Sequence, residues 1–414
     1  MNRLVLIGNG FDLAHGLKTS YADFIDWYWA KRYKELLETH NNVSEDCLLT
    51  IQYQERSAIS TYIENQVRYN LIFQGLTTKG KIDWIIGNVD EFYSKPSPLF
   101  KRILLGLNSK TWGGIEQDYY DILKEYAFRD PNVYPTEPPI KALNQQLRFL
   151  QQLLVEYLQD EAQKKITKIP SIEKAIFAPI NTKDVSVFQL EQMKEHVTYW
   201  LNEGYDYLLD KEQRFGFVPN EHMDELELYK VKPWSKKLND YPQLTRLPNR
   251  ILLLNFNYTH TPRMYFHNDV MDYISIHGNL EAPKSVIFGY GDELDDKFKE
   301  LKAHKNNACL SHVKSIRYLE APNYRQMLSF IESEPFQVLI MGHSCGNSDR
   351  TLLNTIFEHP NCVSIKPYYY ITDKEKGTDN YTELVQHISR NFTDMKLMRD
   401  RVVNKTQCEP LVKP

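Results

Sequence analysis

Apolar residues occur in short, continuous runs at the start of the chain and again after residue 250. The first run, Leu4 to Ile7, contains no polar residue in alternate positions. A continuous apolar run of this length is typical of a parallel strand that is buried on both faces. We therefore expect strands here and in the later runs Ile251 to Asn255, Tyr273 to Ile276, Val286 to Phe288, Gln337 to Met341 and Val363 to Tyr370.

Helical patterns accompany these runs. Ser20 to Trp29 predicts a helix with Thr19 or Ser20 as its N-cap, and Asp349 to Glu358 and Asn380 to Arg390 predict two more. Buried strands that alternate with helices are typical of an α/β protein with a mostly parallel sheet. The simplest architecture places the first strand at the N-terminus and the other strands after residue 250, in one Rossmann-like sheet.

The sequence from Lys31 to Leu247 has a different, helical character. Between Lys141 and Ala162, large apolar residues recur at three- and four-residue spacing, which predicts a helix with one core-facing stripe. Two or three heptads are too few to predict a coiled coil. The proline-rich stretch Asp130 to Pro139 breaks the region in two, and a loop from Asp240 to Asn249 closes it. We therefore predict a Rossmann-like domain formed by residues 1–30 and 248–414, interrupted by an α-helical insertion, residues 31–247. The stripe residues are Leu143, Leu147, Leu150, Leu154 and Tyr157.

Composition narrows the classes of function. The formal net charge is -4 and the pI is about 6.3. These values indicate no basic surface and so disfavour nucleic acid as the main partner. The five cysteines are scattered without a C-x-x-C pair, so neither a zinc site nor a redox dithiol is indicated and a reducing compartment is expected. The N-terminus does not resemble a signal peptide, and no apolar run is long enough to span a membrane. We expect a cytoplasmic protein.

The turn after the first strand carries glycines at Gly8, Gly10 and Gly16. The dinucleotide fingerprint G-x-G-x-x-G requires a third glycine where Leu13 stands, and no Walker lysine is present. A glycine-rich turn between a strand and a helix still offers backbone N–H groups to a pyrophosphate. The alternative is a tight turn that binds nothing.

Polar residues end four of the later apolar segments. The carboxyl ends of parallel strands meet at one edge of a sheet, where open α/β sheets bind their ligands, so these residues predict one shared pocket. They are Asn255, Asn257, Thr259, His277, Gly278, Asp292, Gly342, His343, Ser344 and Asp349.

His277 is the sharpest candidate for a general base, because it follows a strand and precedes a glycine; the alternative is a structural histidine. His260, His267 and His343 are further candidates, but no H-x-H or H-E-x-x-H spacing indicates a metal. Gly342 to Gly346 imitates the G-x-S-x-G nucleophile elbow around Ser344, without the later acid and histidine that such hydrolases use.

Thr111 to Leu123, TWGGIEQDYYDIL, is the segment of the insertion with the most site-like composition. Glu116 stands in the first turn of its predicted helix, where an acid is compatible with the helix dipole. We expect Glu116 to be a surface acid, with projection into the pocket as the alternative.

The segments LIGNGFDLAHGLKTSYADF, FNYTHT, IHGNL and MRDRVVNKTQCEPL resemble the AbiH family of phage abortive-infection proteins along the length of the chain. A second, more distant resemblance is to sirtuins. Gly8-x-Gly10-x5-Gly16 is similar to their NAD-binding turn, and three further segments follow in the sirtuin order. These are Phe256 to Thr259 for Q-N-x-D, His277-Gly278 for H-G, and Gly342 to Ser344 for G-T-S.

The sirtuin resemblance implies NAD as substrate or ligand and no metal. It implies that Asn257 positions the nicotinamide ribose or a water and that His277 acts as base. The chemistry of glycosidic cleavage, rather than the resemblance, suggests that Asp12 stabilises the developing positive charge. Thr259, Phe256 and Asp12 replace the sirtuin Asp, Gln and Ser, and the four-cysteine zinc module of protein deacetylases is absent. The remaining implied contacts to the nucleotide are Gly8, Asn9, Gly10, Phe11, Gly16, Thr259, Gly278, Gly342, His343, Ser344 and Asp349.

Two functions follow as hypotheses. The first is hydrolysis of NAD to nicotinamide and ADP-ribose during phage infection, as in the sirtuin-like domains of anti-phage systems. The second is a non-catalytic sensor or interaction module that holds NAD or ADP-ribose and engages a phage or host trigger protein, or a second copy of the chain, through the insertion. A nuclease would need a metal cluster or a basic groove, and the sequence indicates neither.

Overall fold

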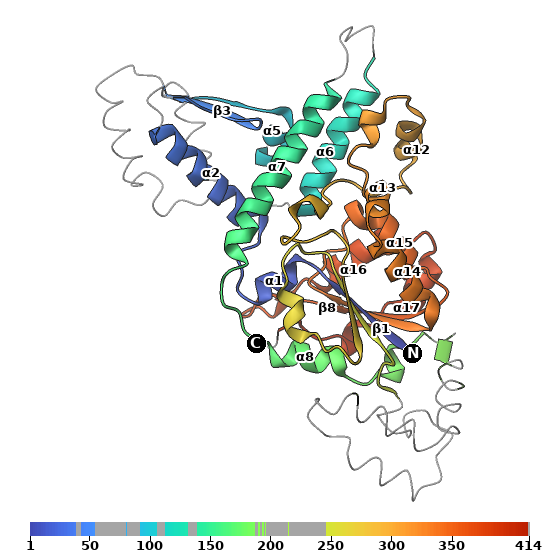
Figure 1. The fold of residues 1–414 in the computed structure, drawn as a ribbon. Helices are drawn as coiled ribbons and strands as arrows, with labels where there is room; N and C mark the ends of the chain where they lie inside the picture. Colours follow the sequence, from blue (N-terminus) through green and yellow to red (C-terminus); the bar gives the residue numbers. More distant parts are fainter. Residues whose placement is uncertain are drawn as a thin grey trace, which may run out of the picture. The chain divides into compact units, whose positions relative to one another are not determined.

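The computed structural model describes residues 1–38, 43–53, 80, 92–105, 112–130, 139–186, 189–190, 193, 195, 214 and 246–412. They form two compact units (Figure 1). The first comprises Met1–Leu17, Lys164–Ile287 and Ser315–Pro414; the second comprises Lys18–Gln163 and Phe288–Lys314. Most of the proline-rich stretch predicted to break the insertion, and of the loop predicted to close it, lies outside the described residues.

A five-stranded, entirely parallel sheet is the centre of the first unit. Its strand order is β6-β5-β1-β7-β8, so the N-terminal strand is in the middle and the strands that pair with it follow residue 250. The predicted parallel α/β architecture is confirmed. The strands are β1 (Asn2–Ile7), β5 (Ile251–Asn255), β6 (Met271–Ser275), β7 (Phe336–Met341) and β8 (Cys362–Tyr368).

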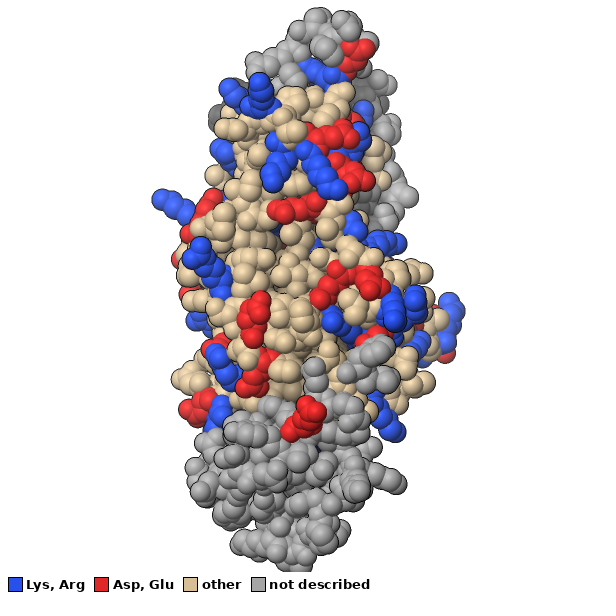
Figure 2. All heavy atoms as spheres, turned by 90° about the vertical axis from the view of Figure 1, so that its right-hand side faces the viewer, with Lys and Arg blue, Asp and Glu red and all other residues tan. Residues whose placement is uncertain are grey.

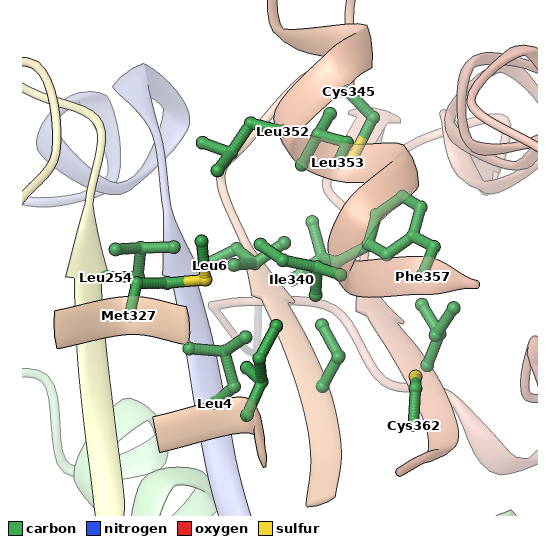
Figure 3. Packing of buried hydrophobic residues seen from close by; sticks show 14 of the residues in the cluster. Leu4, Leu6, Leu254, Met327, Ile340, Cys345, Leu352, Leu353, Phe357 and Cys362 are labelled. Atoms are coloured by element: carbon green, nitrogen blue, oxygen red, sulfur yellow. The ribbon is translucent and has the colours of Figure 1, made fainter. Parts of the chain in front are cut away.

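Burial on both faces explains the continuous apolar run of β1. Leu4 and Leu6 contribute to the core on one face, and Val5 and Ile7 contribute to the core on the other. Because successive side chains of a strand point to opposite faces, both positions of the alternation must be apolar. Figure 3 shows the first of these cores, where side chains of β1, β5 and β7 meet those of helices.

Helices cover both faces of this sheet (Figure 1). α8 (Pro170–Phe177) packs on one face, and α14 (Asn323–Ser333), α15 (Arg350–Phe357), α16 (Tyr381–Arg390) and α17 (Met395–Arg401) pack on the other. The first unit also contains the short α1 (Asn9–Ala14), the hairpin of β9 (Ile371–Asp373) and β10 (Thr378–Asp379), and several 3-10 helices. α13 (Lys314–Arg317) spans the boundary between the units.

One predicted strand is wrong. Residues 286–288 are buried but have no strand partner; Ile287 N–H donates to the carbonyl of His277 at 2.9 Å instead. An apolar run of three residues reports burial, and burial alone does not distinguish a strand from an irregular segment that lies against the core.

The second unit combines helices with a small antiparallel sheet. Its helices are α2 (Tyr21–Glu38), α5 (Pro98–Leu105), α6 (Trp112–Ala127), α7 (Ile140–Glu161) and α12 (Asp296–Ala303). All five apolar residues of the predicted stripe on α7 are buried, which confirms that the stripe faces a core.

The three-stranded sheet of the second unit was not expected in the predicted α-helical insertion. Its strands are β2 (Val43–Glu45), β3 (Leu49–Tyr53) and β4 (Phe92–Pro96), in the order β2-β3-β4. On β3, Leu49 and Ile51 are buried, while Thr50 is half-buried and Gln52 is exposed. This alternation with a period of two residues is the strand signal, but it covers too few residues to stand out in a helical sequence.

The two units divide the chain at positions other than the predicted boundaries, 30/31 and 247/248. α2 belongs to the second unit, where Tyr28 Oη donates to the carboxylate of Asp46 at 2.9 Å and the ring of Phe24 lies 5.9 Å from that of Tyr157. α8 belongs to the first unit, because Ile172 and Ile176 pack into the core on its sheet. Local composition does not show which of two cores a helix joins.

Candidate functional site

The order of the sheet reverses between β1 and β7, because β5 and β6 add on one side of β1 while β7 and β8 add on the other. Open α/β sheets bind ligands at the carboxyl ends of the strands beside such a reversal. The predicted residues follow these ends: Gly8 follows β1, Asn257 follows β5, His277 follows β6, and Gly342 follows β7. The contacts below connect them into one cluster within the first unit.

Glycines allow the β1 turn and the end of β7 to touch. Gly10 N–H donates to the Gly342 carbonyl at 2.8 Å. A Cβ on Gly342 would lie 2.1 Å from the backbone nitrogen of Phe11, and a Cβ on Gly8 would lie 2.5 Å from Cα of His343. Gly342 also has a φ of 77°, which favours glycine. No larger residue fits these positions without displacing the backbone.

The N–H groups of this turn already have partners in the protein. Gly8 N–H donates to the Met341 carbonyl at 3.3 Å, and Phe11 N–H donates to the Gly8 carbonyl at 2.9 Å. With Gly10 bound to Gly342, three of the donors that the sequence assigned to a pyrophosphate contact protein oxygens in this structure.

Gly16 and Gly278 have structural reasons to be glycine. Gly16 follows the C-terminus of α1 with a φ of 81°, and Leu17 N–H returns to the Asp12 carbonyl at 3.2 Å, which ends the helix. Gly278 has a φ of 79°, and a Cβ there would lie 2.2 Å from the Ser285 carbonyl oxygen. Their predicted contacts to a nucleotide remain predictions. Asn9, in the first turn of α1, is half-buried, and the side chain of Phe11 belongs to the core.

Asp12 is a buried carboxylate beside the glycine turn, with 1% of its surface exposed. Thr259 Oγ1 donates to Asp12 Oδ2 at 2.5 Å. Burial raises the pKa of Asp12 to about 6, although hydrogen bonds from Thr259, Thr261 and Asn257 favour the charged form. Asp12 Oδ1 has no hydrogen-bond partner within the described residues. It is therefore a buried acceptor whose hydrogen-bonding capacity the described residues do not use.

The loop after β5 is bound to the same turn. Asn257 Nδ2 donates to the Gly8 carbonyl at 3.0 Å, and Asn257 N–H donates to Asn255 Oδ1 at 3.1 Å. Asn255 Nδ2 donates in turn to the Thr259 carbonyl at 2.9 Å and to Tyr273 Oη at 2.8 Å. These bonds fix the backbone that carries Asn257 and Thr259 next to Asp12.

Two histidines and an aspartate form the second half of the cluster. His277 Nε2 lies 3.2 Å from Asp349 Oδ1, and His343 Nε2 lies 3.6 Å from Asp349 Oδ2. Phe256 contacts both rings, with centroid distances of 5.2 Å to His277 and 4.1 Å to His343. Tyr318 Oη lies 3.2 Å from His277 Nε2. His277 is thus paired with an acid, as in an Asp–His pair in which the carboxylate orients the imidazole.

Ser344 is exposed, and the described residues include no hydrogen bond between its Oγ and a histidine. The imitation of a nucleophile elbow therefore does not assemble a Ser–His pair here. The neighbouring Cys345 has a φ of 54° and is buried, and burial raises the pKa of its thiol far above the usual range. It is not a candidate nucleophile.

Glu116 is not the expected surface acid, because it is 5% exposed. Its Oε2 pairs with Lys314 Nζ at 2.9 Å and its Oε1 accepts a hydrogen bond from Gly289 N–H at 3.1 Å, all within the second unit. Residues 288–314 cover it from far along the sequence. Asp292, predicted to share the pocket, also belongs to the second unit.

His260 and His267 have other neighbours than the cluster. His260 Nε2 lies 3.2 Å from Glu281 Oε1, and the ring of His267 packs edge-on against Phe177. Over the described ranges, we find no group of three or more His, Cys, Asp or Glu side chains arranged to hold a metal ion.

Sequence reasoning missed Thr261, Tyr273 and Tyr318. Thr261 stands two residues after Thr259, and the strand-end argument could have included it. Tyr273 lies inside β6, and Tyr318 precedes α14 without any strand signal, so only the three-dimensional structure connects them to Asn255 and His277.

A family model described as "Bacteriophage abortive infection AbiH" matches residues 4–370. The chain belongs to the AbiH family. AbiH membership gives the protein a role in phage defence by abortive infection. The match ends before the C-terminal segment 398–411. Comparisons with curated proteins and with solved structures gave no match.

Two further features of this AbiH-family protein concern its surface charge and the apolarity of its helices. Figure 2 shows one face of the molecule, on which Lys and Arg side chains are interspersed with Asp and Glu, in keeping with a net charge of -4. None of the helices that the structure describes is long and apolar enough to cross a membrane.

Proposed function

We propose that this AbiH-family protein acts in abortive infection by cleaving the N-glycosidic bond of NAD in the cytoplasm, which releases nicotinamide and ADP-ribose. One observation carries the proposal: Asp12, Asn257 and His277 belong to one cluster of contacts at the carboxyl edge of the sheet, beside the reversal of strand order. The order is 3-2-1-4-5 when the strands of this sheet are numbered along the chain, as in the Rossmann-like dinucleotide-binding fold.

The residue types suit the chemistry. Nicotinamide is a cationic leaving group, and its departure from the ribose gives a transition state that resembles an oxocarbenium ion and is stabilised by a nearby negative charge. Asp12, with a pKa of about 6, is ionised at neutral pH and supplies that charge. Asn257 holds the ribose or the attacking water, and His277 accepts a proton from that water.

The second candidate is a module that binds NAD or ADP-ribose without turnover. It is favoured by the occupied donors of the turn: the N–H groups of Gly8, Gly10 and Phe11 and the side-chain amide of Asn257 all contact protein carbonyls. In this candidate the nucleotide acts as a signal, and the second unit engages a trigger protein or another copy of the chain.

The experiment measures NAD and nicotinamide by chromatography during incubation with the purified protein. We expect release of nicotinamide, reduced at least about 100-fold in His277→Ala and in Asn257→Ala. His304→Ala is the matched control, because His304 is an exposed histidine of the second unit; this variant should retain the full rate.

The experiment distinguishes the hydrolase from the binding module, and it can also exclude the hydrolase. A rise in melting temperature with NAD or ADP-ribose, but no nicotinamide, supports the binding module. If neither ligand changes the melting temperature, NAD is followed in cells during phage infection. A constant NAD concentration there, while the protein still protects the culture, excludes the hydrolase.

A further inference from the structure

Asp349 presents one carboxylate oxygen to each of two histidines. Its Oδ1 lies 3.2 Å from His277 Nε2 and its Oδ2 lies 3.6 Å from His343 Nε2, and the side chain of Asp349 is 10% exposed. An ionised carboxylate can only accept hydrogen bonds. Asp349 therefore favours, for each histidine, the tautomer with a proton on Nε2, the nitrogen that faces the carboxylate.

The tautomer of His343 is fixed from its other side as well. Cys345 N–H donates to His343 Nδ1 at 3.0 Å, so Nδ1 must hold a lone pair and the proton of the neutral ring is on Nε2. The donor is held in place, because Asn391 Nδ2 donates to the Cys345 carbonyl at 2.9 Å. The positive φ of Cys345, 54°, is sparsely populated for a residue with a side chain. Such backbone strain is concentrated at functional sites.

His277 has its contacts on one nitrogen only. Asp349 Oδ1 and the hydroxyl of Tyr318 both lie 3.2 Å from Nε2, and the described residues make no hydrogen bond to Nδ1. With the proton on Nε2, the lone pair is on Nδ1.

We infer that Asp349 is a positioning residue that holds both histidines in the Nε2–H tautomer and makes Nδ1 of His277 the atom that accepts a proton. The chemical step rests on the proposed function. A water O–H bond breaks and its proton moves to Nδ1, while the water oxygen bonds to the ribose carbon. The bond to nicotinamide breaks, nicotinamide keeps the electron pair, and the proton then passes to solvent. Asp349 stabilises the transient imidazolium, as in an Asp–His pair.

The variant Asp349→Asn tests whether Asp349 sets the tautomers of the two histidines, because an amide has one accepting oxygen and one donating nitrogen. His343 is fixed as a donor at Nε2 by Cys345, so the amide oxygen turns to His343. The amide NH₂ then faces His277, whose Nε2 must become the acceptor. His277 changes to the Nδ1–H tautomer and loses its free lone pair, while His343 is unchanged.

The experiment records long-range ¹H–¹⁵N correlation spectra of the full-length protein with ¹⁵N-labelled histidine. It is run at about pH 8.5, well above the ordinary imidazole pKa of about 6.5. His277→Gln and His343→Gln assign the two rings. We expect Nε2–H for both rings in the wild type and a change of His277 alone in Asp349→Asn. Asp296→Asn, an exposed acid whose side chain is 91% exposed, is the matched control and should change neither ring.

Tyr318→Phe provides a second test that does not depend on the folding of Asp349→Asn. The variant removes the Tyr318 hydroxyl, which is the second group near Nε2 besides the Asp349 carboxylate. His277 should remain in the Nε2–H tautomer. An Nδ1–H signal for His277 in the wild type, or a change in Tyr318→Phe, overturns the inference. So does an unchanged His277 in folded Asp349→Asn.

The spectra need no substrate, so the inference and the proposed function fail separately. If the tautomers are correct but neither the purified protein nor protected, infected cells consume NAD, the hydrolase is rejected and the role of Asp349 in holding both rings is kept. If NAD turnover is found, a fall in kcat of at least about 100-fold in Asp349→Asn, with KM changed little, supports that role. Turnover that survives in Asp349→Asn with an unchanged His277 rejects the role of Asp349 and keeps the hydrolase.

Discussion

Asp12 is a residue whose charge opposes folding. Its pKa is about 6 in the folded protein, against 3.8 for an ordinary aspartate, because burial disfavours the ionised form. Between these two values the folded chain binds more protons than the unfolded chain, so stability falls as the pH rises through this window. At neutral pH the loss is about 3 kcal/mol. A carboxylate with a pKa perturbed by burial is a candidate for a functional role.

Asp12→Asn is therefore expected to raise the free energy of unfolding at pH 7.5 by about 1–3 kcal/mol. The amide keeps an oxygen for the hydroxyl of Thr259 and removes the buried charge. Urea denaturation between about pH 4 and pH 7.5 measures the free energy of unfolding of the wild type and of Asp12→Asn. The difference in stability between the two proteins should disappear toward about pH 4. A variant that is less stable than the wild type at pH 7.5, with the same pH dependence, would contradict this account of Asp12.

Gly342 and Gly16 provide a matched pair of left-handed glycines. Their φ values are 77° and 81°, but a Cβ would meet Phe11 N at 2.1 Å on Gly342 and nothing within 4 Å on Gly16. Gly16→Ala should cost about 1–2 kcal/mol, the backbone penalty alone. Gly342→Ala should cost several kcal/mol more, because the β1 turn must move. Equal losses in thermal or urea denaturation would show that the contact between the two segments is not tight.

At the scale of elements, α2 begins with a reciprocal cap. Asp23 N–H donates to Ser20 Oγ at 3.2 Å and Ser20 N–H donates to Asp23 Oδ2 at 3.3 Å, so Ser20, one of the two predicted residues, is the N-cap. The neighbouring Thr19 is buried, and its hydroxyl has no partner within the described residues. Only one of these two hydroxyls supports the helix.

Ser20→Ala should lower the free energy of unfolding by about 1 kcal/mol, because the first turn of α2 loses its side-chain acceptor. Thr19→Val keeps the shape of its residue and should leave stability unchanged or slightly higher, since a buried hydroxyl without a partner is removed. Urea denaturation followed by circular dichroism compares the two. A larger loss of stability in Thr19→Val than in Ser20→Ala would show that Ser20 is not the N-cap.

At the scale of the whole molecule, the cysteines report how completely the cores exclude solvent. Cys47 is exposed, while Cys309, Cys345, Cys362 and Cys408 are buried. Burial also raises the pKa of the buried thiols, so the reactive thiolate is rare at these positions.

Titration of the native protein with a disulfide reagent should therefore modify Cys47 rapidly and the other cysteines only slowly. All five should react in denaturant. In Cys47→Ser, the rapid phase should be absent. Rapid modification of a second thiol in that variant would show that one of the cores opens under native conditions.

The sequence by itself determined the central sheet and the edge at which the candidate site lies. Continuous apolar runs report burial on both faces, so Leu4 to Ile7 and Ile251 to Leu254 could be predicted as strands of one parallel sheet. Because such strands end at one edge, Asn257, His277 and Gly342 could be assigned to a common region before any contact was known. The period of the apolar pattern likewise gave the buried stripe of α7.

The tertiary structure alone decided which partner each of these residues has. A local pattern reports that a position is buried, but not which distant segment covers it. Glu116 is buried by residues 288–314, the N–H of Gly10 is bound by Gly342, and Asp349 faces both histidines across intervals of 72 and 6 residues in the chain. Hydrogen bonds depend on distances between atoms of about 3 Å. Only the folded chain sets such distances, so the chemistry of the site follows from the fold.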